Sequence, residues 1–396
     1  MKSAYSTAGR LSLLAMWSVM LLIAEGQRLQ AAPPEGSAKL GVRFAEMIMA
    51  RWPDPMTLDP AKHGWEYNSG IVLFGMSKIY QKTGDQRLLN YIRRWVDGYV
   101  EGNGNIKWNQ EQTHNLDYIQ PANLILFLYE QTRDPKYKAA AKTVRDCYDK
   151  IPRNAEGGFW HKEIYPNEMW VDGIYMAEPY LVHYARLFGD AAFCRDTAVV
   201  QTTLIAKHAF DPKAKLPYHG WDQDRNAQWV NPETGLSPIF WSRGTGWFAM
   251  ALVDILEYLP KKHPGYASLR ELLKNLVEGV KNVQDPKTGL WFQVLDKGGQ
   301  AGNWIETSGS GMFIYALRKA VRLKYIDARY KEVAERAWKG LQSYVERDDK
   351  GVPVITEAVR GMGVQANYDR YVGFERLKNS THGLMAVQLA ASEMEW

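Results

Sequence analysis

The chain has 396 residues, of which 46% are hydrophobic and 23% charged, an ordinary globular composition that fits two or three domains or one toroid or barrel. Its formal net charge of +5 gives no support to nucleic-acid binding, which needs a concentrated basic face. Cys147 and Cys194 are too few for a disulfide framework and lack metal-site spacing, so we expect buried thiols, with a single bridge as the less favoured alternative. The 15 tryptophans and 22 tyrosines fit either a large aromatic core or a sugar-binding cleft lined with flat rings.

The first 32 residues have the pattern of a secretory signal peptide. Lys2 and Arg10 precede an apolar run at 11–24, and the segment QAAPPEG follows at 30–36. The apolar run is too short to cross a bilayer, which takes about 20 residues, but it fits the core of a signal peptide. We therefore predict a leader at 1–32 and a single catalytic domain at 33–396. The mature protein is expected to be exported, either periplasmic or secreted, and not to be held in a membrane.

A weak internal repeat occupies most of the remaining chain. Each unit contains an apolar helical run that ends near a tyrosine, a short turn, and a second helical run. Five units and the start of a sixth lie at 68–92, 117–141, 172–196, 244–273, 308–337 and 381–394. A further helix, at 37–52, has no partner before it. The chain therefore contains two alternating sets of six helices.

The two sets of helices differ in their apolar pattern. The first helix of each unit is apolar around most of its circumference and should be buried, whereas the second is amphipathic and should lie outside. Strand-like alternation is nearly absent, with candidates only at 158–164 and 289–295. Six inner and six outer helices joined as hairpins predict an all-α fold, the (α/α)6 toroid, rather than an open solenoid. All inner helices would run the same way, so their N-termini would gather at one end and favour an anion there.

Asp172 lies in the apolar run EMWVDGIYMAEPY at 168–180. Asp172, Asp117 and Asn68 each precede by twelve residues the tyrosine near which the inner-helix run ends. Two interpretations of this shared position are equally open. The three side chains could be N-caps, each stabilising its helix by about 1 kcal/mol. Alternatively, the two acids could meet in one cleft, where mutual repulsion would raise one pKa into the range of general acid–base catalysis.

The loops that precede the inner helices also contain cations and aromatic rings that suit an acidic sugar. Arg243 can bind a carboxylate with its planar fork, although a structural acid is the alternative partner. A single histidine, His219, is more often structural, but its loop lies close to Arg243 in the sequence. We find no zinc spacing, phosphate loop or serine-hydrolase elbow and predict neither a metal nor a cofactor. The candidate residues of these loops are Lys162, Trp170, His219, Trp221, Trp241, Arg243 and Trp247.

These stretches resemble the unsaturated rhamnogalacturonyl hydrolases of glycoside hydrolase family 105, which are related to the unsaturated glucuronyl hydrolases of family 88. The two longest and most specific stretches are GGFWHKEIYPNEMWVDGIYMAEP at 157–179 and NPETGLSPIFWSRGTGWFAMALVDILEYLP at 231–260. Shorter ones lie at 64–70, 116–122, 218–222 and 285–296, so the resemblance spreads over nearly all of the chain after the leader. The chain departs from the family pattern at 368–391. There Thr381 and His382 precede the last inner helix, at a position where members of the family have a different polar pair.

The resemblance implies a reaction that composition and spacing do not reveal. The substrate would be an oligosaccharide left by a polysaccharide lyase, with a C4=C5 double bond in its non-reducing uronyl residue. Asp172 would protonate C4 and then activate the water that adds at C5, and Asp117 would set the protonation state of Asp172. The resemblance places Tyr67, Lys162, His219 and Arg243 against the substrate and the rings of Trp170 and Trp247 on the sugar. We include Asn68 among the substrate-binding residues.

The predicted function is removal of this uronyl residue, with the unsaturated rhamnogalacturonan disaccharide from pectin as the expected substrate. The alternatives are an inverting glycosidase with its acids about 6.5–9.5 Å apart, a polysaccharide lyase, and a non-catalytic carbohydrate-binding protein. Besides the oligosaccharide we expect no nucleic-acid or membrane partner. The sequence leaves open the galacturonyl or glucuronyl origin, the sugar in the next subsite, the chain length and the oligomeric state.

Overall fold

The computed structural model of the protein describes residues 38–59, 64–108 and 114–396. Within it, Lys39–Trp396 form one compact unit. The leader predicted at 1–32 lies outside the described residues. None of the helices in the described ranges is long and apolar enough to cross a membrane.

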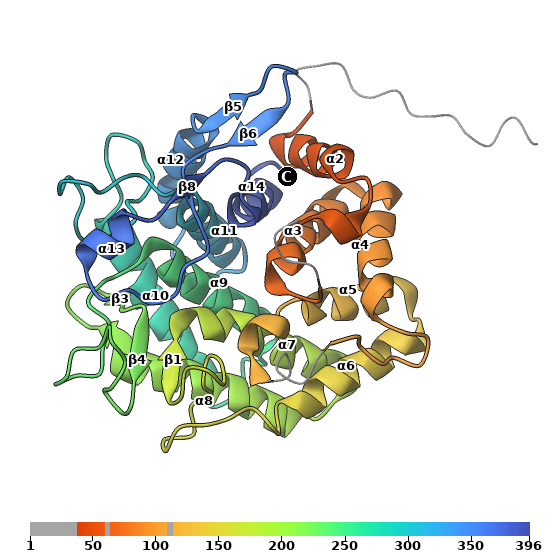
Figure 1. Cartoon of the computed structure of the whole chain (residues 1–396), viewed down its shortest axis with the longest axis horizontal. Coiled ribbons are helices and arrows are strands. Elements are labelled where there is room, and N and C mark those ends of the chain that lie inside the picture. Colours follow the sequence, from red (N-terminus) through yellow and green to blue (C-terminus); the bar gives the residue numbers. More distant parts are fainter. Residues whose placement is uncertain (1–37, 60–63, 109–113) are drawn as a thin grey trace, which may run out of the picture. The chain divides into compact units, whose positions relative to one another are not determined.

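Two sets of helices alternate along the chain (Figure 1). The inner helices are α3 (Tyr67–Thr83), α5 (Ala122–Thr132), α7 (Val171–Phe188), α9 (Ser242–Tyr258), α11 (Thr307–Arg322) and α14 (Thr381–Met394). The outer helices are α2 (Leu40–Arg51), α4 (Gln86–Tyr99), α6 (Pro135–Cys147), α8 (Ala191–Ala209), α10 (Tyr266–Asn282) and α12 (Tyr330–Gln342). This alternation confirms the predicted (α/α)6 toroid.

The ring closes between the two ends of the unit. Each inner helix packs on the next, and α14 packs on both α11 and α3. The helix without a preceding partner, α2, packs on α14 and so completes the sixth hairpin. The Glu395 carboxylate just after α14 accepts the N–H groups of Leu40 and Gly41 at 2.8 and 3.0 Å. A negative charge there is favourable because a helix N-terminus carries partial positive charge and unpaired donors.

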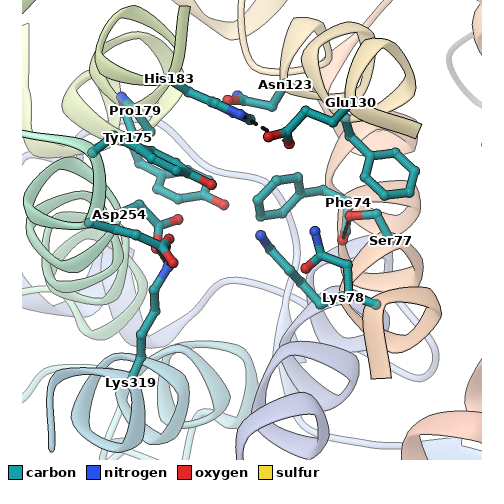
Figure 2. A pocket seen from close by; sticks show the side chains of 14 residues that line it. Phe74, Ser77, Lys78, Asn123, Glu130, Tyr175, Pro179, His183, Asp254 and Lys319 are labelled. Atoms are coloured by element: carbon teal, nitrogen blue, oxygen red, sulfur yellow. Dashed lines mark hydrogen bonds and ion pairs between the residues drawn. The ribbon is translucent and has the colours of Figure 1, made fainter. Parts of the chain in front are cut away.

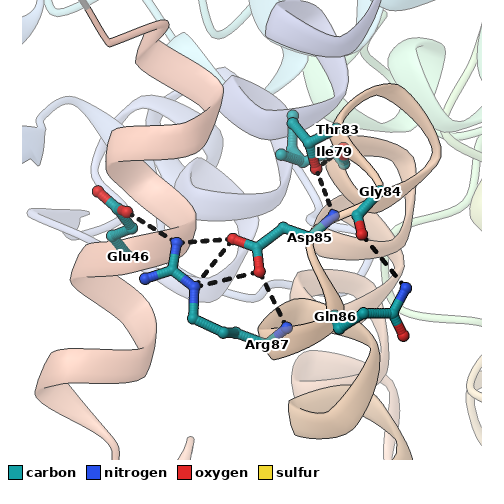
Figure 3. A network of polar contacts seen from close by, with 7 residues as sticks. All are labelled: Glu46, Ile79, Thr83, Gly84, Asp85, Gln86 and Arg87. Carbon is teal, nitrogen blue, oxygen red and sulfur yellow. Dashed lines mark hydrogen bonds and ion pairs between the residues drawn. The ribbon is translucent and has the colours of Figure 1, made fainter. Parts of the chain in front are cut away.

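The turn between α3 and α4 shows how a hairpin is made (Figure 3). At Gly84 the chain has a φ of 69°, a left-handed conformation that glycine adopts without strain and that ends α3. Asp85 then caps α4 by accepting the N–H of Arg87 at 2.9 Å, and Asp134 caps α6 in the same way. Arg87 also pairs with Asp85 and with Glu46 of α2, but its side chain is 63% exposed, so these ion pairs add little stability.

Burial follows the predicted division between inner and outer helices. Every residue of α7 from Val171 to Ala185 is buried, as is every residue of α9 from Ser242 to Leu256. In contrast, α4 buries one face at helical spacing, made of Leu88, Tyr91, Ile92, Trp95 and Val96. Cys147 at the end of α6 and Cys194 in α8 are buried as free thiols without a bridge, and burial raises their pKa values to about 11 and about 12.

The two strand candidates were wrong. Residues 158–164 and 289–295 make only isolated bridges, because these loops meet a neighbouring segment for single residues as they cross the helix ends. The described strands are two or three residues long and form four antiparallel pairs. The pairs are β1 (Glu168–Trp170) with β4 (Gly220–Asp222), β2 (Phe210–Asp211) with β3 (Leu216–Pro217), β5 (Val345–Arg347) with β6 (Pro353–Ile355), and β7 (Ala358–Val359) with β8 (Arg376–Leu377).

Charged side chains fill the centre of the ring near the C-terminal ends of the inner helices (Figure 2). Lys319 of α11 donates to Asp254 Oδ1 and Glu257 Oε2 of α9, both at 2.7 Å. Across the gap, His183 of α7 pairs with Glu130 of α5 at 3.2 Å. The cavity between these groups holds only about 20 Å³, which is the room of one water molecule.

Candidate active site

A cavity of about 540 Å³ opens at the other end of the ring, where the inner helices begin. This volume is in the usual range for small-ligand sites. Eight of the nine predicted site residues line it, and the ninth, His219, contacts one of the eight. The lining predicted residues are Tyr67, Asn68, Asp117, Lys162, Trp170, Asp172, Arg243 and Trp247.

The N-cap interpretation of the repeated position was wrong. Asn68 and Asp172 are the second residues of α3 and α7, and neither helix has a side-chain cap. Asp117 lies in the 3-10 turn η3 (Leu116–Tyr118), which Asn115 caps instead. The helix α5 begins only at Ala122, after Pro121, a residue favoured at helix starts because it lacks an N–H. The acids are therefore not committed to capping their own helices.

Backbone pairing places His219 beside Asp172. Gly220 of β4 pairs with Trp170 of β1, and the N–H of Val171 donates to the His219 carbonyl at 3.1 Å. As a result, His219 Nε2 lies 3.2 Å from Asp172 Oδ2, with His219 only 1% exposed. The two atoms are close but not aligned as a hydrogen bond. Catalytic hydrogen bonds are often poorly aligned without substrate and tighten when it binds.

Asp117 has a different set of partners. Its Oδ2 lies 2.6 Å from Lys162 Nζ and its Oδ1 lies 3.4 Å from His161 Nε2. Burial lowers the pKa of Lys162, but the Asp117 carboxylate, together with Tyr165 and Tyr118, raises it. The net shift is upward, so the ammonium stays charged. Burial lowers the pKa of His161 to about 4, which keeps this imidazole neutral near pH 7. The cavity therefore contains one acid facing a fixed cation and another facing an imidazole.

Arg243, in the first turn of α9, is held by the backbone. Its Nη1 donates to Val359 O at 2.6 Å and to Ser308 Oγ at 3.3 Å, and its Nη2 donates to Arg360 O at 2.8 Å. Its Nε has no hydrogen-bond partner among the described residues. Carbonyls thus occupy the tip of the guanidinium, and the edge formed by Nε and Nη2 remains for an acceptor. Carboxylate binding by Arg243 stays a prediction, now restricted to that edge.

The two predicted tryptophans line the cavity with little exposed surface. Trp170 is 7% exposed and stacks with His161 and Tyr165, at centroid distances of 4.3 and 4.9 Å. Trp247 is 1% exposed and stacks on Tyr175 at 4.8 Å. Contact of these rings with a sugar stays a prediction, limited to the small part of each ring that faces the cavity. Among the other ring candidates Trp241 lines the cavity, whereas Trp221 stacks on His208 of α8 and does not.

Sequence reasoning missed several residues that the tertiary structure brings to the cavity. His382 lines the cavity, and its Nε2 forms a hydrogen bond with Tyr67 Oη at 3.1 Å. The segment that departs from the family pattern therefore contributes to the site. His161 also lines the cavity, and its position next to Lys162 in the sequence was a usable signal. Tyr371 contacts His219, although the two residues lie 152 positions apart in the sequence. Within the described residues no three His, Cys, Asp or Glu side chains are grouped so that they could hold a metal ion.

Comparison with known proteins agrees with this fold. Residues 41–396 match the family described as Glycosyl Hydrolase Family 88. A family 105 glycoside hydrolase from C. acetobutylicum ATCC 824 is 34% identical and superposes with a TM-score of 0.84 over 90% of this chain and 99% of that one. The unsaturated 3S-rhamnoglycuronyl hydrolase of Alteromonas sp. (strain LOR) is 32% identical over 81% of this chain and 75% of its own length. The unsaturated rhamnogalacturonyl hydrolase YesR of Bacillus subtilis (strain 168) is 23% identical over 82% and 89%, respectively. The chain therefore belongs to the glycosyl hydrolases of families 88 and 105 and is a glycoside hydrolase.

Proposed function

We propose that the protein removes the 4,5-unsaturated uronyl residue from the non-reducing end of lyase-generated oligosaccharides. The observation that carries the proposal is the pair of carboxylates in one cavity with unlike partners, Asp172 against His219 and Asp117 against Lys162. Two carboxylates in unlike surroundings are typical of sites in which one acts as an acid and the other stays ionised. The relatives named for unsaturated uronyl substrates support the same reaction class.

In the proposed reaction, Asp172 gives its proton to C4 of the vinyl ether. The resulting carboxylate takes a proton from water as the water oxygen bonds to C5. The hemiketal at C5 then opens by breaking its bond to the ring oxygen, which leaves a hemiacetal at C1 that releases the remaining saccharide. Asp117, held by Lys162, orients the water and keeps a negative charge near the developing cation. Each turnover consumes one water molecule.

The substrate carboxylate is proposed to bind at the helix N-termini. The first turns of α3, α7, α9 and α14 contribute residues to the cavity, and helix starts favour anions. The Nε of Arg243, which is buried and has no hydrogen-bond partner among the described residues, is the proposed donor to a carboxylate oxygen there. This arrangement explains why an acidic sugar would be selected over a neutral one.

The proposed substrate is the unsaturated rhamnogalacturonan disaccharide from pectin. One relative is named for a rhamnogalacturonyl and another for a rhamnoglycuronyl substrate, which favours rhamnose in the next subsite. We also propose export, with removal of the leader at 1–32, so that the enzyme meets lyase products in the periplasm or outside the cell. N-terminal sequencing of the mature protein tests the leader.

A spectrophotometric assay with purified protein and a lyase-generated unsaturated disaccharide tests the reaction. We expect the ultraviolet absorbance of the C4=C5 bond to disappear as the second sugar is released. Release of sugar with the absorbance retained would instead indicate an ordinary glycosidase, and a rise in absorbance on intact polymer would indicate a lyase. Tight binding without either change would indicate a carbohydrate-binding protein. Unsaturated disaccharides that differ only in the second sugar then identify the preferred leaving group.

A further inference from the structure

Tyr371 contacts the active site from a part of the chain that the proposed mechanism does not use. It lies in α13 (Tyr368–Val372), is fully buried, and its hydroxyl is 2.8 Å from His219 Nδ1. His219 is 152 residues away in the sequence and faces Asp172 with its other nitrogen, Nε2. The three side chains therefore form a row from Tyr371 through His219 to Asp172.

The positions of the hydrogen atoms in this row follow from the other hydrogen bonds of the Tyr371 hydroxyl. The N–H of Gln365 donates to Tyr371 Oη at 3.3 Å, so the oxygen is already an acceptor. The remaining O–H has His219 Nδ1 as its acceptor among the hydrogen bonds of the described residues. Burial raises the pKa of Tyr371, so the phenol keeps its proton. If Nδ1 carried a proton instead, the buried O–H would lose its acceptor, which costs more than an ordinary hydrogen bond contributes.

Other buried contacts hold Tyr371 in this place. Gln293 Nε2 donates to the Tyr371 carbonyl at 3.1 Å, and Trp241 Nε1 donates to Gln293 Oε1 at 3.1 Å. The ring of Trp241 also packs against His219, with a centroid distance of 4.4 Å. The same indole that orients Gln293 thus limits the movement of the imidazole. The titratable groups in this part of the site, besides Tyr371, include Asp172 from α7, Arg243 from α9, Tyr67 from α3 and His161 from the loop before β1.

We propose that Tyr371 is a positioning residue that fixes His219 as the tautomer with its proton on Nε2. In this tautomer His219 donates toward Asp172 Oδ2 and cannot take the proton of Asp172. The transferable proton of Asp172 then resides on Oδ1, and the carboxylate that remains after transfer is stabilised by the Nε2–H. The link to catalysis rests on the proposed role of Asp172, whereas the tautomer itself does not.

Nuclear magnetic resonance of ¹⁵N-histidine-labelled protein tests the tautomer without any activity measurement. The resonances of His219, identified by their loss in His219→Gln, should show a protonated Nε2 and an unprotonated Nδ1 near pH 7. Observation of a protonated Nδ1, in either the other tautomer or the imidazolium, would overturn the proposal. This measurement uses the wild-type protein and therefore does not depend on the folding of a Tyr371 variant.

Tyr371→Phe tests the catalytic consequence while it keeps the ring. We expect kcat to fall about 3- to 10-fold, the loss of one neutral hydrogen bond, with KM nearly unchanged. The alkaline limb of the kcat–pH profile should move to higher pH, because an ionised Asp172 loses a fixed donor. Tyr368→Phe is the matched control, since this tyrosine in the same helix contacts Ala301 O at 3.0 Å and should leave the profile unchanged.

The two readouts separate the possible failures. An unchanged pH profile and an unchanged His219 tautomer in folded Tyr371→Phe would refute the role of Tyr371. If the wild-type protein does not act on unsaturated disaccharides, the proposed function fails. In that case the His219 resonances still decide whether Tyr371 sets the tautomer.

Discussion

The two ends of the inner-helix ring contain similar residue types in opposite arrangements. At the N-terminal end, a cavity of about 540 Å³ contains acids whose partners come from loops, such as Lys162 for Asp117. At the C-terminal end, Asp254 pairs directly with Lys319 on the neighbouring inner helix, and the remaining space is about 20 Å³. An acid neutralised from an adjacent helix leaves no room for a ligand. An acid whose partner comes from a loop can remain beside an open cavity.

The difference originates in the lengths of the connections. Turns that follow inner helices are short: Gly84 and Asp85 alone join α3 to α4, and Arg133 and Asp134 alone join α5 to α6. The connections that precede inner helices are long, such as 148–170 before α7 and 210–241 before α9. Only the N-terminal end therefore has enough chain to build walls around a cavity. The partial positive charge of the helix starts favours an anionic ligand at that end.

The largest expected effect comes from replacing one acid at each end of the ring and comparing the two variants. Asp172→Asn should lower kcat by about 10²- to 10⁴-fold, since the proposed proton donor is lost. The free energy of unfolding should change by less than about 1 kcal/mol, because Asp172 caps no helix and has no fixed cation as partner. The matched variant Asp254→Asn should do the reverse, lowering stability with kcat retained. Full activity of Asp172→Asn would contradict the proton-donor assignment.

Removing the cation at the closed end should cost stability rather than activity. Lys319→Met leaves Asp254, which is 4% exposed, without its ammonium partner, and we expect a loss of about 3–5 kcal/mol in denaturant unfolding. The pKa of Glu257, which burial alone would raise, is lowered to about 2 by Lys319 and Lys78, so this acid loses a partner as well. Lys162→Met at the open end is the comparison and should raise KM with a smaller effect on unfolding. A Lys319→Met protein as stable as wild type would show that the network is not structural.

The smallest predicted effect is a pH dependence of stability from the histidine beside Asp117. Burial lowers the pKa of His161 from 6.5 to about 4, so the unfolded chain binds a proton more readily than the folded one. The stabilisation is present above about pH 6.5 and is lost as the pH falls toward 4, amounting to about 3 kcal/mol at most. Unfolding free energies at pH 7 and pH 4 should differ less in His161→Gln than in wild type.

His183 at the closed end provides the control for this pH dependence. Burial lowers the pKa of His183 too, but Glu130 at 3.2 Å opposes the shift. His183→Gln should therefore change the difference between pH 7 and pH 4 by less than His161→Gln does. An equal change in both variants would show that Glu130 does not offset the effect of burial on His183.

The sequence by itself determined the architecture and selected two acids, Asp117 and Asp172, that the structure places in one cavity. The apolar pattern of α7 and the one-sided pattern of α4 are local properties, repeated every three or four residues, and they predicted inner and outer helices correctly. The repeat counted six hairpins, and the resemblance selected Asp172 and Asp117. The predicted helix starts were wrong by two residues at α7, where Trp170 holds the N-cap position and Asp172 is the second residue of the helix. The strand prediction at 289–295 was also wrong, since this apolar loop is buried along nearly its whole length but pairs with its neighbours only through isolated bridges.

Only the tertiary structure decided which groups face each acid. Asp172 meets His219, His219 meets Tyr371, and Arg243 is held by the carbonyls of Val359 and Arg360, all across large sequence separations. Such pairs depend on ring closure and on loops crossing the helix ends, neither of which leaves a periodic signal. The same holds for Asp254 and Lys319, which look like ordinary helix-end charges until neighbouring inner helices bring them together. Periodic burial is encoded within a few residues of each helix, whereas the chemistry of an acid is set by groups that only the folded ring places beside it.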